Sequence, residues 1–512
     1  MDDVVLHADR PLAEAEVVAV ARQAAPVSLS KESLERLRAA RSHVDALAAS
    51  DTPVYGVSTG FGALATRHIP TELRTQLQRS LVRSHAASSG AEVEAEVVRG
   101  LMLLRLQTMA TGRTGVQPET ASAYAALLNA GITPVVREYG SLGCSGDLAP
   151  LAHAALAVMG EGEVRVRGEL LPALVALAAA GIEPVTLAEK EGLALINGTD
   201  GMLAMLMLSC ADLALLARTA DLTAAMSLEA LLGTDRVLAP DLMALRPHPG
   251  QAAAAANMRR LLEGSSIVAS HRGPEDTRVQ DAYSVRCAPQ VAGGLRDTVT
   301  HARLVAAREA ASAVDNPVLL PDGRLESNGN FHGAPIAYVL DFLAIPAADL
   351  ASISERRTDR MLDQNRSHGL PAFLAHDPGV DSGLMIAQYT QAGLVSELKR
   401  LANPASVDSI PSSAMQEDHV SMGWAAGRKL RRAVDALTRV LAIELMTAAR
   451  ALDLRGPLAP APATEAAVVA LREQVPGPGA DRYLTPEIEA AVELVRSGRV
   501  LAAAEAVTGP LE

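Results

Sequence analysis

The sequence predicts an all-α fold, a large helical bundle of long central helices with a loop-rich N-terminal region. Apolar residues make up 49% of the 512 residues, which is enough to fill a large core. Aromatic residues make up only 2%, so Ala, Leu, Val and Met must build that core. This composition favours closely packed helices over a β-sandwich, whose strands are rich in aromatic and β-branched residues.

Apolar residues recur at three- and four-residue spacing through most of the chain, as in helices with one buried face. The predicted helices lie near residues 31–49, 71–87, 92–111, 117–130, 147–160, 201–232, 291–313, 334–356, 382–402, 420–453 and 463–474. Two short stretches, 164–166 and 318–320, have β propensity, and a Pro-Asp-Gly turn follows the second. The Pro/Ala-rich stretch 457–462 predicts a break before a C-terminal helical segment.

The composition also argues against several classes of protein. The formal net charge is −13, so we expect no nucleic-acid-binding surface. Cys144, Cys210 and Cys287 form neither a C-x-x-C pair nor a metal-ligand spacing, which predicts a reducing cytoplasmic location and no metal site. No lysine follows a glycine, which excludes a P-loop and disfavours a lysine-bound pyridoxal cofactor.

No membrane segment is expected from the sequence. The N-terminus is acidic and lacks the apolar run of a signal peptide. The most apolar stretch, 201–217, is interrupted by Ser209 and Asp212 and is too short to span a bilayer comfortably. We therefore expect this stretch to be a buried core helix.

The most informative segment is GSLGCSGDLAPLAH, residues 140–153, which places Cys144-Ser145-Gly146 in a Gly-flanked turn before a helix. Because Gly146 has no Cβ, its amide nitrogen is unshielded and can attack the Cys144 carbonyl to close a five-membered ring. Loss of water from Ser145 then leaves an exocyclic methylene, an electrophile made from the chain itself. A plain turn before a helix is the alternative. A nucleophile elbow is excluded, because Asp147 occupies its final glycine position.

With Asp147-Leu148-Ala149-Pro150-Leu151 included, this segment resembles the signature of the aromatic amino acid ammonia-lyase family. In that family an Ala-Ser-Gly core cyclises autocatalytically to 4-methylidene-imidazol-5-one (MIO). Cys144 replaces the Ala here, but the ring uses only its carbonyl. Six further strings follow the family's order: YGVSTGFG (55–62), RSHAA (83–87), INGTDG (196–201), QDAYSVRCAPQ (280–290), ESNGNFHG (326–333) and QEDHVSMG (416–423).

The resemblance covers residues 50–425 and implies a fumarase/ammonia-lyase-like helical fold. Residues 1–225 then form an N-terminal region with the MIO-forming loop, and residues 226–512 form a long-helix bundle region with the remaining active-site loops. The two regions are expected to act as one functional unit, residues 1–512. The implied cofactor is MIO from Cys144-Ser145-Gly146, with no external cofactor and no metal.

The implied reaction removes ammonia and a weakly acidic β-hydrogen from an α-amino acid. The resemblance assigns Tyr55 as the base above the β-carbon, in a Gly-rich loop able to close over the substrate. A tyrosine can act so only if its phenolate is stabilised. Tyr283 supports the MIO oxygen and the departing amine. Asp147 assists ring formation or orients the loop, with a helix N-cap as the alternative.

Further residues are implied to bind the substrate. Arg286 is expected to clamp the carboxylate with two hydrogen bonds, a geometry that suits a guanidinium better than an ammonium. Asn197 resembles the donor that helps to hold the carboxylate and the ring oxygen. Asn328 and Phe331 are expected to line the pocket beside the MIO.

Two positions resemble those that contact an imidazole in histidine-specific members of the family, His85 and Glu417, and Gln280 adds a further contact. An imidazole offers a donor and an acceptor nitrogen, so a carboxylate and a histidine can bind its two ends. A phenyl ring would leave the Glu417 carboxylate buried and unpaired, at a cost of about 1–3 kcal/mol. The expected reaction converts L-histidine to trans-urocanate. The alternatives are a tyrosine or phenylalanine lyase, a 2,3-aminomutase, or a helical scaffold without catalysis.

The sequence departs from many relatives at Ser58, Asp200 and Ala282, where Asn, Gln and Pro are common. None of these changes removes a group that the chemistry needs, although Asp200 can alter the charge near Asn197. The family further implies a cytosolic homotetramer with active sites shared between chains. The long apolar helices are consistent with an oligomer, because they need partners.

Overall fold

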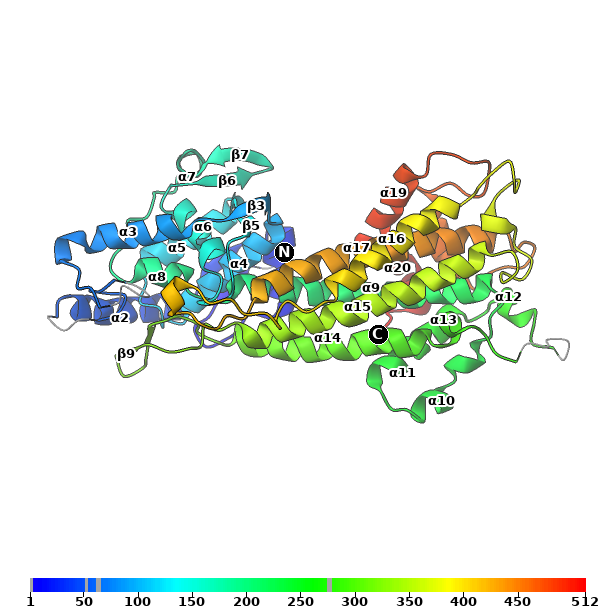
Figure 1. The fold of residues 1–512 in the computed structure, drawn as a ribbon, viewed down its shortest axis with the longest axis horizontal. Helices are drawn as coiled ribbons and strands as arrows, with labels where there is room; N and C mark the ends of the chain where they lie inside the picture. The colour runs from blue at the N-terminus through cyan, green and yellow to red at the C-terminus, as the bar shows by residue number, and fades with distance from the viewer. Residues whose placement is uncertain (1–2, 51–53, 61–65, 274–278) are drawn as a thin grey trace. The chain divides into compact units, whose positions relative to one another are not determined.

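The protein is described by a computed structural model, which covers residues 3–50, 54–60, 66–273 and 279–512 (Figure 1). Within these ranges the chain forms twenty α-helices and only short strands of two to four residues. The predicted all-α class is therefore confirmed.

The chain divides into two compact units that interleave along the sequence. Unit 1 comprises residues 1–211, 302–341 and 404–428, and unit 2 comprises residues 212–301, 342–403 and 429–512. The predicted boundary between residues 225 and 226 stays a prediction. Four long helices have residues in both units: α9 (Asp200–Ala230), α14 (Ala288–Ala310), α15 (Ala334–Leu362) and α17 (Gly423–Asp453).

Unit 1 combines short and medium helices with small two- and three-stranded sheets. Its other elements are β1 (Val4–Leu6), α1 (Glu14–Gln23), β2 (Val27–Leu29), α2 (Lys31–Ala48), η2 (Thr71–Leu73), α3 (Arg74–His85), β3 (Ser89–Glu92), α4 (Ala95–Ala110), α5 (Pro118–Asn129), β4 (Ile132–Pro134), β5 (Arg137–Tyr139), α6 (Leu148–Val158), β6 (Glu163–Val166), β7 (Glu169–Pro172), α7 (Ala173–Ala180), α8 (Glu191–Ile196), β8 (Val318–Leu319), β9 (Leu325–Glu326) and η5 (Ser413–Met415). Strands β1 and β2 pair in parallel, whereas β3–β5, β4–β6–β7 and β8–β9 are antiparallel.

Helix α4 forms the centre of unit 1. Every residue from Val97 to Ala110 is buried, including the charged Arg99 and Arg105. A helix that is apolar on all sides is stable only when it is surrounded, and α4 packs against α1 and α5. The two arginines donate hydrogen bonds to backbone carbonyls, Arg99 to those of Val20 and Leu128 and Arg105 to those of Asn197 and Val314.

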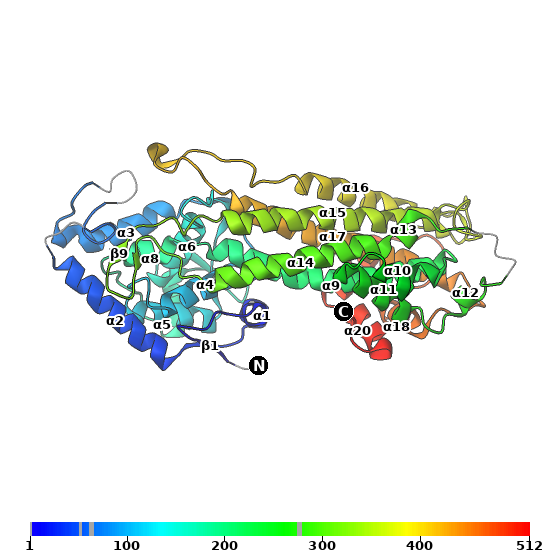
Figure 2. The ribbon, with the colours of Figure 1, turned by 90° about the horizontal axis from the view of Figure 1, so that it is seen from below.

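Unit 2 contains the greater part of the long helices and a set of shorter ones. These are η3 (Asp235–Leu238), α10 (Pro240–Ala244), α11 (Pro249–Leu261), α12 (Ser266–Ala269), α13 (Tyr283–Arg286), η4 (Ala372–Leu374), α16 (Met385–Leu401), α18 (Pro462–Arg472), α19 (Thr485–Arg496) and α20 (Arg499–Thr508). Helix α18 begins where the Pro/Ala-rich stretch ends, as predicted, and packs against α20 (Figure 2).

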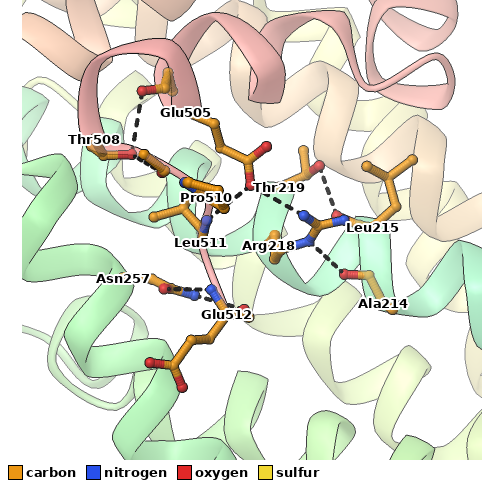
Figure 3. A network of polar contacts seen from close by, with 12 residues as sticks. Ala214, Leu215, Arg218, Thr219, Asn257, Glu505, Thr508, Pro510, Leu511 and Glu512 are labelled. Carbon is orange, nitrogen blue, oxygen red and sulfur yellow. Dashed lines mark hydrogen bonds and ion pairs between the residues drawn. The ribbon is translucent and has the colours of Figure 1, made fainter.

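The last residues of the chain are held by specific hydrogen bonds within unit 2 (Figure 3). The Asn257 side chain on α11 accepts from the Glu512 amide and donates to the Glu512 carbonyl, at 3.0 and 2.9 Å. The Glu505 carboxylate accepts from the Leu511 amide and from Arg218 on α9, both at 3.1 Å. This network fixes the segment after α20 against two other helices.

Two helices, α9 and α15, are long and apolar enough to cross a membrane by length and composition alone. In α9, 78% of the most apolar window is buried inside the protein, and in α15 the share is 61%. Burial to this extent is what a core helix shows. It agrees with the interpretation of residues 201–217 as a core helix.

Every helix predicted from periodicity is present, with ends that differ by a few residues. Periodicity did not predict the remaining helices, which are α1, α7, α8, α10–α13, α19 and α20. Most of these are short, and a helix such as α8 with six residues contains too few turns to show a 3.6-residue period.

Candidate active site

The triad Cys144-Ser145-Gly146 lies in the loop between β5 and α6 of unit 1. Two glycines of this loop adopt left-handed backbone angles, with φ +68° at Gly143 and +74° at Gly146. A Cβ at Gly146 would collide with the Gly198 carbonyl, and a Cβ at Gly143 would collide with the Ser421 hydroxyl. Only glycine fits these two positions, because the Cβ of any other residue would clash there and a positive φ would strain its backbone.

Three hydrogen bonds attach the triad loop to other segments of unit 1. The Asp147 amide donates to the Gly198 carbonyl at 2.7 Å, next to the backbone pairing of Gly146 with Gly198. On the other side, the Ser421 hydroxyl donates to the Gly143 carbonyl at 3.0 Å. The Met422 amide donates to the Leu142 carbonyl at 2.9 Å. The loop is thereby held between the segment before α9 and the segment before α17.

The Asp147 carboxylate ties the loop to the start of α9. It is fully buried and accepts hydrogen bonds from the Met202 amide at 2.8 Å and the Ser141 hydroxyl at 3.0 Å. Its side chain makes no capping hydrogen bond to α6, which begins directly after it, so the N-cap alternative is not what the structure shows. Burial raises the pKa of Asp147 to about 7.

Asn197 ends α8 and immediately precedes the Gly198 that pairs with the triad. Its Nδ2 donates to the Asn316 carbonyl at 2.9 Å, and the Asn316 side chain in turn accepts from the Asn328 amide at 3.1 Å. The two predicted residues Asn197 and Asn328 are thus joined through a third asparagine. The Asn197 Oδ1 is buried and has no hydrogen-bond partner among the described residues.

Buried charges support this asparagine cluster. Arg105 on α4 donates to the Asn197 carbonyl at 2.7 Å and lies 3.5 Å from the Asp200 carboxylate. Burial raises the pKa of Asp200, and the positive charge of Arg105 opposes that rise. Lys190 and Asp315 form a fully buried ion pair at 2.5 Å, and the Asp315 carbonyl accepts from Asn328 Nδ2 at 3.0 Å.

Three of these supporting residues, Arg105, Lys190 and Asp315, were not predicted from the sequence as part of the site. Arg105 stands in the apolar run LMLLRLQTM, and a charge inside such a run is a signal of a buried polar contact. Lys190 and Asp315 carry no comparable local signal, because they pair with each other across 125 residues of the chain.

Glu417 lies beside the triad. Burial, together with the neighbouring Glu417 carboxylate, raises the pKa of the Cys144 thiol to about 12. The Ser412 hydroxyl donates to Glu417 Oε2 at 2.9 Å. The triad and Glu417, the residue assigned to imidazole recognition, thus lie together within unit 1.

The other predicted residues of unit 1 lie on separate elements. His85 is the last residue of α3, and its Nδ1 contacts the Leu81 carbonyl at 2.9 Å, so that Nε2 is the ring nitrogen left for another partner. Tyr55 and Phe331 are half-buried in loops. Among the described residues, no hydrogen bond joins His85 or Phe331 to the triad. The predicted loop closure over the substrate involves Phe61 and Gly62, which lie outside the described residues.

Ser58, one of the departures from the family, is buried and accepts a hydrogen bond from the Val54 amide at 2.9 Å. It closes the turn that contains Tyr55. Gly56 in this turn has φ +75°, and a Cβ there would press on Leu193 and Pro317. The turn therefore needs both the hydroxyl and the glycine.

Gln280, Tyr283 and Arg286 belong to unit 2, not to the unit that contains the triad. Tyr283 starts α13 and is 72% exposed, and the Arg286 guanidinium lies 4.6 Å from the centre of its ring. Gln280 and Arg286 line a cavity of about 270 Å³ together with Arg236, His271 and Arg272. The Arg286 Nε is buried and has no hydrogen-bond partner among the described residues.

The geometry thus separates the predicted residues into two sets. Unit 1 contains the triad with Tyr55, His85, Asp147, Asn197, Asn328, Phe331 and Glu417, and unit 2 contains Gln280, Tyr283 and Arg286. In the part of the chain that the structure describes, no group of three or more His, Cys, Asp or Glu residues has the arrangement of a metal site.

A helical protein with this buttressed Gly-flanked triad falls in the class of lyases that act on amino acids. Residues 12–473 match the family model described as aromatic amino acid lyase, and the chain belongs to this family. Relatives named histidine ammonia-lyase are 68% identical in Streptomyces avermitilis, over 97% of each chain, and 67% identical in Streptomyces griseus, over 100% of each chain.

Solved structures agree with this assignment. A histidine ammonia-lyase from Trypanosoma cruzi matches with a TM-score of 0.90 and 38% identity, covering 99% of this chain and 96% of that one. A tyrosine aminomutase from Streptomyces globisporus matches with a TM-score of 0.95 and 36% identity over the whole of both chains.

Proposed function

We propose that the protein is an ammonia-lyase that converts L-histidine to trans-urocanate and ammonia without oxidation, the first step of histidine degradation. The observation that carries the choice of substrate is the Glu417 carboxylate beside the triad, held by Ser412. A carboxylate accepts a hydrogen bond from an imidazole N–H, whereas a phenyl ring offers it no donor. Relatives that are 67–68% identical carry the name histidine ammonia-lyase, which supports the same conclusion.

The proposal includes autocatalytic formation of MIO from Cys144-Ser145-Gly146, with no external cofactor and no metal. The residues present fit this group. The Gly146 amide makes no backbone hydrogen bond with another described residue, so its nitrogen is not already committed. The Asn197 Oδ1 is buried and has no hydrogen-bond partner among the described residues; because this oxygen is an acceptor, it suits an N–H donor such as the amine of a bound substrate. Once formed, MIO supplies an electrophile that ordinary side chains lack.

The chain's own residues bind the substrate and move protons. Glu417 and His85 bind the two ends of the imidazole, with Gln280 as a further contact, and Asn197 and Arg286 hold the α-carboxylate. Tyr55 accepts the β-proton, and Tyr283 assists the departing amine. Asn328 and Phe331 line the pocket. Asp147 keeps the loop in place through its contacts to α9, so that the triad is constrained before it reacts.

We further propose a homotetramer whose active sites are shared between chains. Large apolar side chains are exposed on unit 2, namely Phe342 and Ile345 on α15 and Ile386 and Tyr389 on α16. The two helices are joined by a hydrogen bond from Gln388 to Glu355 at 2.6 Å, so the four exposed apolar side chains lie on neighbouring helices. Exposed apolar surface of this kind is typical of protein interfaces. Light scattering of the purified protein measures the number of chains.

The proposed location is the cytoplasm. Cys144, Cys210 and Cys287 are all unpaired, which fits a reducing compartment.

A second candidate keeps the chemistry and changes the substrate to tyrosine or phenylalanine, as a lyase or a 2,3-aminomutase. The fold match to a tyrosine aminomutase at a TM-score of 0.95 favours it. A helical scaffold without catalysis is the remaining alternative. It is disfavoured because the triad and every residue assigned to the reaction are present.

One experiment separates these candidates. The purified protein is incubated with L-histidine, L-tyrosine or L-phenylalanine. The conjugated product of a lyase is followed by ultraviolet absorbance, and the unconjugated β-amino acid product of an aminomutase is identified by chromatography. An intact-mass measurement checks for the loss of two water molecules, with Ser145→Ala as the control that cannot form the methylene. Turnover of tyrosine but not histidine contradicts the substrate assignment, and an active protein with the full unmodified mass contradicts MIO formation.

A further inference from the structure

Glu417 closes an unusual turn in the segment between α16 and α17. Ser412 and Glu417 form an isolated antiparallel pair, in which the Ser412 amide donates to the Glu417 carbonyl at 2.9 Å and the Glu417 amide donates to the Ser412 carbonyl at 3.3 Å. The three residues Ser413, Ala414 and Met415 lie inside this pair. All three adopt left-handed angles, with φ of 52°, 52° and 69°.

Three successive non-glycine residues in this region are strained, because the Cβ of each approaches a carbonyl oxygen. Such a conformation persists only where the surrounding contacts hold it, and it is found most often at functional sites. The backbone pair of Ser412 and Glu417 supplies those contacts. The sequence here contains no glycine that would relieve the strain.

The side chains of the same pair are also joined. Ser412 is extended, with φ −139° and ψ 178°, and its hydroxyl donates to Glu417 Oε2 at 2.9 Å. A carboxylate has four lone-pair positions on its two oxygens, so one hydroxyl leaves capacity for a second donor. The hydrogen bond from Ser412 therefore fixes the rotamer of Glu417 and leaves lone pairs on the carboxylate that can accept from a second donor.

The next part of the segment fixes the distance from this turn to the triad. The Val420 amide donates to the Ser409 hydroxyl at 3.0 Å, which ties the two arms of the segment together. Ser421 and Met422 then bond to the triad loop through the carbonyls of Gly143 and Leu142. Glu417 is thus only four residues from an anchor on the loop that contains Cys144.

We propose that Ser412 is the positioning residue for substrate selection: through its hydroxyl and the strained turn, it holds the Glu417 carboxylate in the orientation that receives the ring N–H of an imidazole. This inference rests on the proposed function. Ser412 acts through Glu417 and does not itself contact the reacting atoms. Its removal should weaken recognition of histidine while the triad still matures.

The test uses a pair of variants of equal shape, Ser412→Thr and Ser412→Val, in the full-length protein. Both branched side chains suit the extended backbone at this position, and only Thr keeps the hydroxyl. We expect Ser412→Val to lower kcat/KM for L-histidine about tenfold, mainly through KM, since a hydrogen bond to a charged group is lost. Ser412→Thr should remain close to the wild type. Intact mass should show the loss of two water molecules in both variants.

Two comparisons make the result specific. Ser413→Ala is the matched control, because the Ser413 hydroxyl has no partner among the described residues, and its kinetics should be unchanged. In a Glu417→Ala background, Ser412→Val should have no additional effect, whereas a merely structural role would add its own loss.

The outcomes also separate this inference from the proposed function. If Glu417→Ala impairs histidine turnover but Ser412→Val does not, the role of Ser412 is wrong and the proposed function stands. An equal loss in the Thr and Val variants likewise contradicts it, because the hydroxyl is then not what matters. Should Glu417→Ala turn over histidine as well as the wild type does, both the recognition of imidazole by Glu417 and the role of Ser412 are wrong.

Discussion

The two units differ in how completely one chain builds its share of the proposed active site. In unit 1 the triad loop is bound on both sides, by Gly198 and by Ser421 and Met422, and Asp147 beneath it is fully buried. In unit 2, Tyr283 is 72% exposed, and the buried Nε of Arg286 has no partner among the described residues. A charged side chain and a tyrosine arranged in this way are available for contacts that the described residues of unit 2 do not supply.

The difference indicates a division of tasks. Cyclisation of a backbone loop requires a rigid, constrained turn, which local packing in unit 1 provides. Recognition of a carboxylate requires an arginine that is not already paired, since a guanidinium occupied by an internal partner binds a ligand poorly. Substitutions in each unit therefore test this difference.

Ser145→Ala removes the proposed source of the methylene from unit 1. We expect kcat to fall by at least about 10³-fold, the scale on which loss of a covalent or acid–base group acts. The fold should be retained, because a hydroxyl is lost from a loop held by backbone contacts and by Asp147. Product absorbance and circular dichroism measure the two properties. Substantial activity in a protein that lacks the mass change would contradict the proposed formation of MIO in unit 1.

Arg286→Lys tests unit 2. Lysine keeps the charge but not the paired donors, and we expect kcat/KM to fall by about 10- to 100-fold with no change in thermal stability. Mixed oligomers sharpen the comparison: co-expression of Ser145→Ala chains with Arg286→Lys chains should recover part of the activity if the two units contribute to the site from different chains. If the mixed oligomers recover no activity, the proposal that chains share an active site is contradicted. The Ser145→Ala/Arg286→Lys double variant provides the inactive control.

Glu417→Gln tests recognition in unit 1. The amide keeps the shape but loses the charge, and we expect kcat/KM for L-histidine to fall by about 10- to 100-fold, the equivalent of 1–3 kcal/mol. The rate with L-phenylalanine should fall less or rise, because the cost of covering a charged carboxylate with an apolar ring disappears. An equal loss for both substrates would mean that Glu417 supports the loop and does not select the ring.

Asp147 gives unit 1 a pH dependence of stability. Burial raises its pKa from about 3.8 to about 7, so the folded protein retains a proton that the unfolded chain has released. Its contribution is therefore fully present below about pH 4, decreases as the pH rises towards 7, and is constant above that value. We expect the melting temperature of Ser145→Ala, relative to Ser145→Ala/Asp147→Asn, to decrease over this window. The Ser145→Ala background removes any effect of ring formation, and a pH-independent difference contradicts the raised pKa.

Cys144→Ala should have the smallest effect. The ring requires only the carbonyl of this residue, and the thiol is a weak hydrogen-bond donor. We expect the mass change to be retained and kcat/KM for histidine to stay within about twofold, as for loss of a weak contact. A large loss would show that the Cys144 thiol beside Glu417 contributes to recognition of the substrate.

Helix periodicity located the long helices because their apolar faces repeat over many turns. The short α8 has too few turns to show such a repeat and was missed, although Asn197, one of the predicted site residues, directly follows it. The strings of the family resemblance located Asn197 and Glu417 without indicating what holds them. Their supports, Arg105 and Ser412, are recognised only from the contacts that they make.

The sequence by itself determined the helical class, the Gly-flanked triad and the residue types available for the reaction, because these depend on composition, short-range spacing and the shape of individual residues. Tertiary structure decided which distant segments constrain the triad, that Ser412 holds Glu417, and that Arg286 belongs to a different unit from Ser145. The first and the last of these features depend on contacts between residues far apart in the chain, and local patterns contain no information about which distant segments will pair. The bond from Ser412 to Glu417 spans only five residues, but it depends on a left-handed turn that no glycine in the sequence indicates.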